Sequence, residues 1–174
     1  MKKIIIVILM LTTVSIFAAG ESPYYSAPTH KIFEKFIGKW NVIYANQTDK
    51  GAPAGGRGDA VSSLNLGKTI LEFESELKFE LGDIRSNFLV GYDKNKSLYY
   101  FLTYNNAGES PALLWGEYLP ENKTFEFKSY SGFPKNGDSR LILELVRDDK
   151  FILKSFTFEN GKERPTLDMG YIKK

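Results

Sequence analysis

The sequence lacks cysteine altogether and contains a single histidine, His30, among its 174 residues. Without cysteine the chain can form neither disulfide bonds nor thiolate metal sites. With one histidine, a transition-metal site would need carboxylates for nearly all of its other ligands. No nucleophile-elbow sequence is present, so His30 has no local support as part of a Ser-His-Asp site. We therefore predict no catalytic residues, no metal site and no cofactor.

Excess charge of either sign is also missing once the first 20 residues are set aside. The full chain has 23 basic and 21 acidic residues, but Lys2 and Lys3 belong to residues 1–20, which contain no acidic residue. The remaining 21 basic and 21 acidic residues balance each other. Nucleic acids and anionic membranes attract proteins largely through excess lysine and arginine. We therefore do not expect the protein to bind nucleic acid.

The one long apolar run stands at the start of the chain. It covers residues 4–14, follows two lysines, and precedes the small residues Ala18, Ala19 and Gly20. This order is typical of a secretory signal peptide. We predict a signal peptide over residues 1–20, cleaved after Gly20 or, alternatively, one or two residues earlier, and a periplasmic or secreted protein. The competing interpretation is a membrane anchor, but a spanning helix needs about 20 apolar residues, so we expect a mature chain that does not span a membrane.

Residues 21–37 are predicted to form an extended lead-in followed by a short helix. Pro28 and Thr29 are typical of a helix start. Gly38 is a residue type that commonly ends a helix. The apolar residues between them recur at helical spacing on one face: Ile32, Phe33, Phe36 and Ile37.

Residues 38–174 alternate apolar and polar side chains between turn sequences. The clearest alternation lies in residues 69–79, which predicts a strand with one buried and one wet face. Asn160-Gly161 is the strongest hairpin signal. The polar, glycine-rich segment 46–58 is predicted to be the longest loop. About ten strands are expected, at 40–44, 59–66, 69–79, 84–92, 98–104, 111–119, 124–130, 140–146, 150–158 and 164–172.

Many short strands with regular turns suit either a β-sandwich or a β-barrel. Consecutive tight hairpins, with few connections long enough to cross over, favour the barrel. We therefore predict an all-β fold, an antiparallel up-and-down barrel of about ten strands with a short N-terminal helix at one end. It would form a single domain over residues 38–174. Such a barrel holds either its own side chains or one small ligand in its interior.

Gly38-Lys39-Trp40, between the predicted helix and first strand, resembles the opening of a lipocalin or related calycin barrel. Nearly all of the chain after residue 20 is similar to an uncharacterised bacterial family of lipocalin-like exported proteins, known only as a domain of unknown function. The family usually has Leu-Gly-Gly-Arg at the second hairpin, where this chain has Leu66-Gly67-Lys68-Thr69, so that arginine is not supplied here. The resemblance implies a barrel fold and no particular activity. It rests on the order of His30, Gly38-x-Trp40, Leu66-Gly67 with Ile70-Leu71, Gly91-Tyr92-Asp93, Gly116-x-Tyr118 and Met169-x-Tyr171-x-Lys173-Lys174.

Aromatic residues are abundant, with 13 Phe, 10 Tyr and 2 Trp. An apolar wall with a few placed polar groups is typical of small-molecule sites. The structural alternative is that the tryptophan of Gly-x-Trp closes one end of the barrel and that tyrosine hydroxyls reach water at strand ends. The ligand-binding residues that we predict are Trp40, Phe73, Tyr92, Tyr100, Trp115 and Phe127.

Three classes of function remain open. The first, which we predict, is a barrel that binds a small apolar or amphipathic molecule in its interior. The alternative is an envelope interaction protein without enzymatic activity, whose barrel is filled and whose loops or outer face bind a partner. An enzyme would need convergent polar side chains with perturbed pKa values, and the sequence favours a non-enzymatic protein. The oligomeric state is left open.

Overall fold

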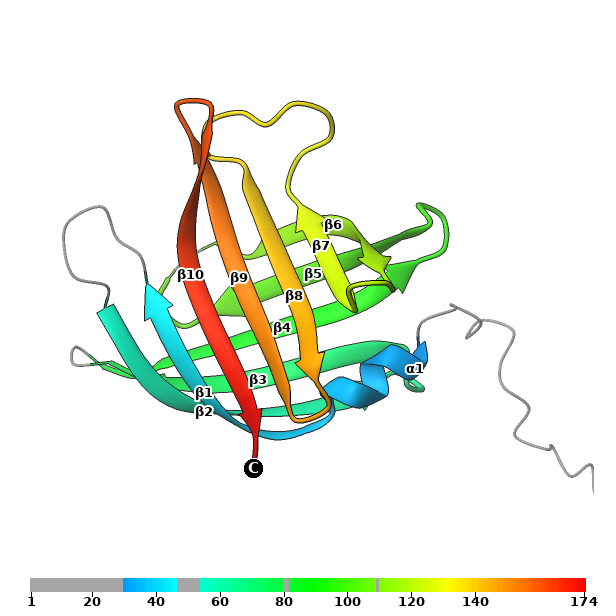
Figure 1. Ribbon diagram of the computed structural model, residues 1–174, viewed down its shortest axis with the longest axis vertical. Coiled ribbons are helices and arrows are strands. Elements are labelled where there is room, and N and C mark those ends of the chain that lie inside the picture. The colour runs from blue at the N-terminus through cyan, green and yellow to red at the C-terminus, as the bar shows by residue number, and fades with distance from the viewer. Residues whose placement is uncertain (1–29, 47–53, 80–81, 109) are drawn as a thin grey trace, which may run out of the picture.

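The computed structural model describes residues 30–46, 54–79, 82–108 and 110–174 (Figure 1). The predicted signal peptide, its cleavage site, the lead-in and Thr29 lie outside these residues. A short helical segment is followed by ten antiparallel strands that close into a barrel. This confirms the predicted fold class. In the part of the chain that the structure describes, no helix is long and apolar enough to cross a membrane.

The strands follow one another around the barrel in chain order, and β1 closes the ring by pairing with β10. The helical segment lies beside one end of the barrel, which we call the helix end (Figure 1). The opposite end, which carries residues 106–108, 110–111, 129–138 and 160–161 between strands, is called the far end. The elements are α1 (His30–Phe33), η2 (Glu34–Phe36), β1 (Gly38–Asn46), β2 (Ala54–Asn65), β3 (Ile70–Lys78), β4 (Ile84–Asp93), β5 (Leu98–Asn105), β6 (Ala112–Leu119), β7 (Thr124–Lys128), β8 (Ser139–Arg147), β9 (Lys150–Glu159) and β10 (Lys162–Lys173).

The alternating pattern of the sequence sets the core. In β3, Leu71, Phe73 and Leu77 are buried, while the glutamates between them face outward. Burial of each such side chain is worth roughly 1.5–3 kcal/mol, and a slip of one residue would turn the whole face to water. The hairpin at Asn160-Gly161 has positive φ at both residues, 51° and 72°, as its sequence predicted.

The helical segment closes the helix end with two phenylalanines. Phe33 and Phe36 are fully buried, and their rings lie 5.7 and 6.4 Å from that of Phe125. The sequence predicted one continuous helix to Ile37, whereas α1 tightens into the 3-10 turn η2 and Ile37 is already extended. These two short turns place both rings over the helix end of the barrel.

The predicted loop over residues 46–58 is wrong at Asn46, which ends β1, and at residues 54–58, which belong to β2; residues 47–53 lie outside the described residues. The glycines there are strand residues over which neighbouring groups lie closely. A Cβ on Gly56 would lie 2.2 Å from the Tyr44 hydroxyl oxygen, and one on Gly58 would lie 2.3 Å from the Glu76 carbonyl oxygen. Glycine in a strand can mark such close approach as well as a turn.

Candidate functional site

The six predicted ligand-binding residues do not share one site. Trp40, Phe73 and Phe127 are fully buried inside the barrel. Tyr92 is partly buried against the core, and its ring lies 4.9 Å from that of Tyr99. Tyr100 and Trp115 are considered separately below, because they lie on the outer face. Whether any of these residues binds a ligand stays a prediction.

The outward position of Tyr100 and Trp115 follows from the register of β5 and β6. Tyr99 and Phe101, on either side of Tyr100, are buried, as is Leu114 beside Trp115. Tyr100 is paired directly with Trp115, and directly opposed residues share one face of a sheet. The β5 sequence is apolar on both faces, so its period does not show which alternate set points inward.

Near the helix end the interior is filled by aromatic rings. Phe73 stacks on Phe88 at 4.2 Å, Phe88 on Phe101 at 5.0 Å, and Phe101 lies 5.4 Å from Phe127. Trp40 contacts Phe151 edge to face at 4.7 Å. These pairs hold the side chains rigidly and add to the stability that their burial provides. Trp40, Phe73 and Phe127 therefore belong to a closely packed cluster of aromatic rings. This matches the structural alternative considered for Trp40.

Toward the far end the inward positions are less well covered. Thr103 lies opposite the inward Phe88, and Ser155 lies opposite the inward Leu141. Both small polar residues are only half-buried, and Leu141 is 7% exposed, whereas Phe127 beside it is 0% exposed. Along β5 and β9 the inner wall thus changes from large rings at the helix end to small, partly exposed polar side chains toward the far end.

Among the described residues, the buried polar groups of the interior are hydroxyls, and no charged side chain is buried. Burial raises the pKa of Tyr171 far above its ordinary value, and burial likewise raises that of Tyr99, with smaller contributions from Tyr92 and Tyr118. These phenols therefore stay protonated near neutral pH and serve as hydrogen-bonding groups. Over the described ranges, no cluster of three or more His, Cys, Asp or Glu side chains is placed to hold a metal ion.

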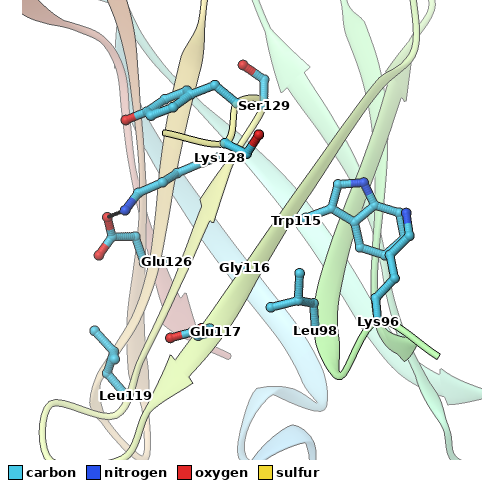
Figure 2. A pocket seen from close by; sticks show the side chains of 11 residues that line it. Lys96, Leu98, Trp115, Gly116, Glu117, Leu119, Glu126, Lys128 and Ser129 are labelled. Carbon is cyan, nitrogen blue, oxygen red and sulfur yellow. Dashed lines mark ion pairs between the residues drawn. The ribbon is translucent and has the colours of Figure 1, made fainter. Parts of the chain in front are cut away.

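A second candidate is a pocket of about 510 Å³ on the outer face around β6 and β7, shown in Figure 2. Trp115 forms one wall, with the Lys96 ammonium 3.4 Å from its ring centroid and the Tyr100 ring 6.1 Å away. On the other side, the Lys128 ammonium pairs with a Glu126 carboxylate at 2.9 Å. This volume lies within the range of small-molecule sites.

Sequence reasoning missed most of this outer pocket. Glu117 lies directly opposite Glu126, and Trp115 directly opposite Lys128. The signal available was the spacing of two between Trp115 and Glu117 and between Glu126 and Lys128, which places each pair on one face of its strand. The register that brings the two strands together is a tertiary property, so the sequence pattern alone did not reveal the pocket.

Comparison with known proteins supports the fold and names a family. The profile of a family described as "Protein of unknown function (DUF1579)" matches residues 26–173. None of the curated proteins compared with the chain matches it.

Two solved structures are similar to the barrel. The S-type phycobiliprotein lyase CPES from Guillardia theta is 9% identical and has a TM-score of 0.56, over 84% of this chain and 92% of that chain. Rv2717c from M. tuberculosis is 11% identical and has a TM-score of 0.58, over 85% of this chain and 98% of that chain. At these identities the likeness concerns the fold alone.

Proposed function

The chain belongs to the family described as protein of unknown function DUF1579, and we propose that it binds a small apolar or amphipathic molecule inside the far end of its lipocalin-like barrel. One observation carries the proposal. The inward face is sealed by rings at the helix end, whereas the inward Thr103 and Ser155 toward the far end are only partly buried. A ligand that enters there would cover apolar surface that water now reaches.

The proposed contacts differ from the residues that the sequence suggested. Leu141, Leu153 and Met169 are 4–7% exposed and form an apolar surface next to Ser155. The predicted residue Phe127 lies directly opposite Leu141 and borders this surface. A mostly apolar wall with a few hydroxyls suits a molecule with a long apolar part and a small polar part.

Two variants of adjacent residues on β9 test this proposal. Ser155→Phe places a ring on the inward face at the far end, whereas Lys154→Phe places the same ring on the outward face. In a titration with a fluorescent hydrophobic probe, we expect Ser155→Phe to weaken binding about tenfold or more and Lys154→Phe to leave it within about twofold, since tenfold corresponds to about 1.4 kcal/mol. Absence of binding to the unaltered protein, or equal loss in both variants, would contradict the proposal.

We further propose that the protein is exported and that residues 1–20 are removed. The support is the order of lysines, apolar run and small residues at the start of the chain. N-terminal sequencing of the protein from the fraction outside the cytoplasm should begin at Glu21, or at Ala19 or Gly20 for the alternative sites. A cytoplasmic protein that retains Met1 would refute export.

The outer pocket favours a second candidate function, the binding of a protein partner in the cell envelope. Its support is the 510 Å³ pocket walled by Trp115 and Tyr130, because aromatic side chains are enriched at interfaces. A photo-crosslinking residue at Leu98 would capture such a partner in intact cells, whereas one at Lys154, on β9 outside the pocket lining, is the control. Recovery of uncrosslinked protein alone from the Leu98 variant would count against this candidate.

A further inference from the structure

Two serines are the buried polar residues in the part of the chain that the structure describes, and they differ sharply in their surroundings. The Ser62 hydroxyl accepts a hydrogen bond from the Trp40 indole nitrogen at 2.8 Å and donates one to the Phe36 carbonyl oxygen. The Ser75 hydroxyl has no partner at normal hydrogen-bond geometry. Among the described residues, it is the one fully buried side-chain nitrogen or oxygen of which this is true. A buried hydroxyl without a partner destabilises the protein that contains it.

The position of Ser75 connects it to the far end. Ser75 lies opposite Ser86, and Ser86 lies opposite Asn105, the last residue of β5. All three share the inward face, because directly opposed residues of neighbouring strands point the same way. Ser86 and Asn105 are half-buried, while Ser75 is 6% exposed. A row of polar side chains thus runs from the far end to a buried hydroxyl.

Tyr171 brings a second hydroxyl to the inner end of this row. Its side chain is 1% exposed and donates a hydrogen bond to the Met169 sulfur at 3.7 Å, a weak acceptor. Burial raises the pKa of the Tyr171 phenol, and a weak hydrogen-bonding interaction with the Ser75 hydroxyl opposes this rise. The two hydroxyls are therefore neighbours, but they do not form a hydrogen bond of normal geometry with each other.

The surroundings of Ser75 and Tyr171 determine which chemical group of a ligand could bind there. No charged side chain of the described residues is buried, so no enclosed counter-charge lies beside Ser75. An ionised carboxylate or ammonium would lose its hydration there without a partner. A carbonyl or alcohol oxygen, in contrast, can hydrogen-bond to both hydroxyls at a much smaller desolvation cost.

We propose that the barrel binds a molecule whose leading end is an uncharged oxygen group, a carbonyl or a hydroxyl, held between Ser75 and Tyr171 with its apolar part toward the far end. This inference rests on the proposed interior site and adds the class and orientation of its ligand. It assigns the Ser75 hydroxyl its missing partner.

The test uses a matched series of compounds with one alkyl chain: the primary alcohol, the methyl ketone, the carboxylate and the alkane. Each competes with a fluorescent hydrophobic probe. The unaltered protein should bind the alcohol and ketone about three- to tenfold more tightly than the alkane, the range that one net hydrogen bond provides. The carboxylate should bind more weakly than the alcohol. Ser75→Ala and Tyr171→Phe should reduce the preference for the oxygen group and keep the alkane affinity.

Ser62→Ala is the matched control, because it removes a buried serine hydroxyl whose partners belong to the protein. It should lower the melting temperature and keep the preference among the four compounds. Ser75→Ala, without ligand, should leave the melting temperature unchanged or raise it. A fall would show that a buried water or Tyr171 already partners Ser75, and it would overturn the inference.

The remaining outcomes separate this inference from the proposed function. The unaltered protein could bind the four compounds with equal affinity and lose that binding in Ser155→Phe. This result would support the interior site but refute the binding of an oxygen group by Ser75 and Tyr171. If the unaltered protein binds neither the probe nor any compound of the series, both proposals fail.

Discussion

At the scale of single residues, Gly116 shows how closely β6 and β7 approach each other. A Cβ on this residue would lie 1.8 Å from the Glu126 carbonyl oxygen, which is far inside any real contact. The obstacle is backbone rather than a flexible side chain, so it cannot move aside without disturbing the strand pairing. Gly116 therefore allows β6 and β7 to approach each other closely at the outer pocket, which Gly116 lines.

We expect Gly116→Ala to lower the free energy of unfolding by about 1–3 kcal/mol, the range for overpacking of a close contact. Urea unfolding measures this change. Gly170→Ala is the control, because its nearest neighbour, the Ile43 carbonyl oxygen, would lie 3.9 Å from the new Cβ. Equal stability of the two variants would contradict the steric interpretation.

At the scale of elements, Arg140 links the last four strands across the outer face. From β8 its guanidinium donates two hydrogen bonds to Glu163 of β10, at 2.5 and 2.7 Å. It also lies 3.6 Å from Glu126 of β7 and 4.6 Å from the ring centroid of Phe156 of β9. This planar group suits bidentate pairing with a carboxylate and stacking on a ring at once.

The hydrogen bond from Arg140 lowers the pKa of the Glu163 carboxyl, and burial opposes this shift in part. A carboxyl whose pKa is lowered by folding stabilises the protein above its unfolded pKa and loses that effect as pH falls. Glu163→Gln should therefore lower stability by up to about 1 kcal/mol near pH 7, since the pair is partly exposed, and the difference should shrink below roughly pH 4.

Urea unfolding of both proteins at several pH values measures this difference. Glu74→Gln, at an exposed position of β3 for which the structure shows no ion pair, is the control. A difference between the unaltered protein and Glu163→Gln that stays constant from neutral to acidic pH would show that the charge pair is not its cause.

The helical segment contributes to stability through its rings. Phe36 is fully buried, 5.2 Å from the Phe151 ring and 6.4 Å from the Phe125 ring. Phe36→Ala should lower the free energy of unfolding by about 3–5 kcal/mol, because it removes a large buried side chain and leaves a cavity. The exposed Lys31→Ala is the control, and urea unfolding is the measurement. A loss below about 1 kcal/mol would mean that the barrel does not need this closure.

At the scale of the whole molecule, the barrel depends on the pairing of its first and last strands. β10 places Tyr171 opposite Val42 and Met169 opposite Tyr44, and all four side chains are buried. A chain ended after Asp168 should lose cooperative unfolding, whereas one ended after Ile172 should retain it. Thermal unfolding followed by near-UV circular dichroism distinguishes them. A cooperative transition in the shorter chain would show that the barrel is stable without these two buried pairs.

The sequence by itself determined the fold class, the number of strands, most turns and the exclusion of thiolate chemistry. Each of these depends on composition or on local periodicity, which neighbouring residues carry without reference to the rest of the chain. The sequence predicted correctly which side chains of β3 and β7 point into the barrel, because only one face of each strand is apolar. Phe73 and Phe127 were therefore placed inside the barrel from the sequence alone.

The tertiary structure decided what local patterns leave open. Both faces of β5 are apolar, so only pairing showed that Tyr100 and Trp115 point outward. The strand glycines Gly56 and Gly58 and the different roles of Ser62 and Ser75 likewise depend on groups distant in sequence. Periodicity specifies which side chains share a face, whereas the atoms that a face meets are determined only when the barrel closes.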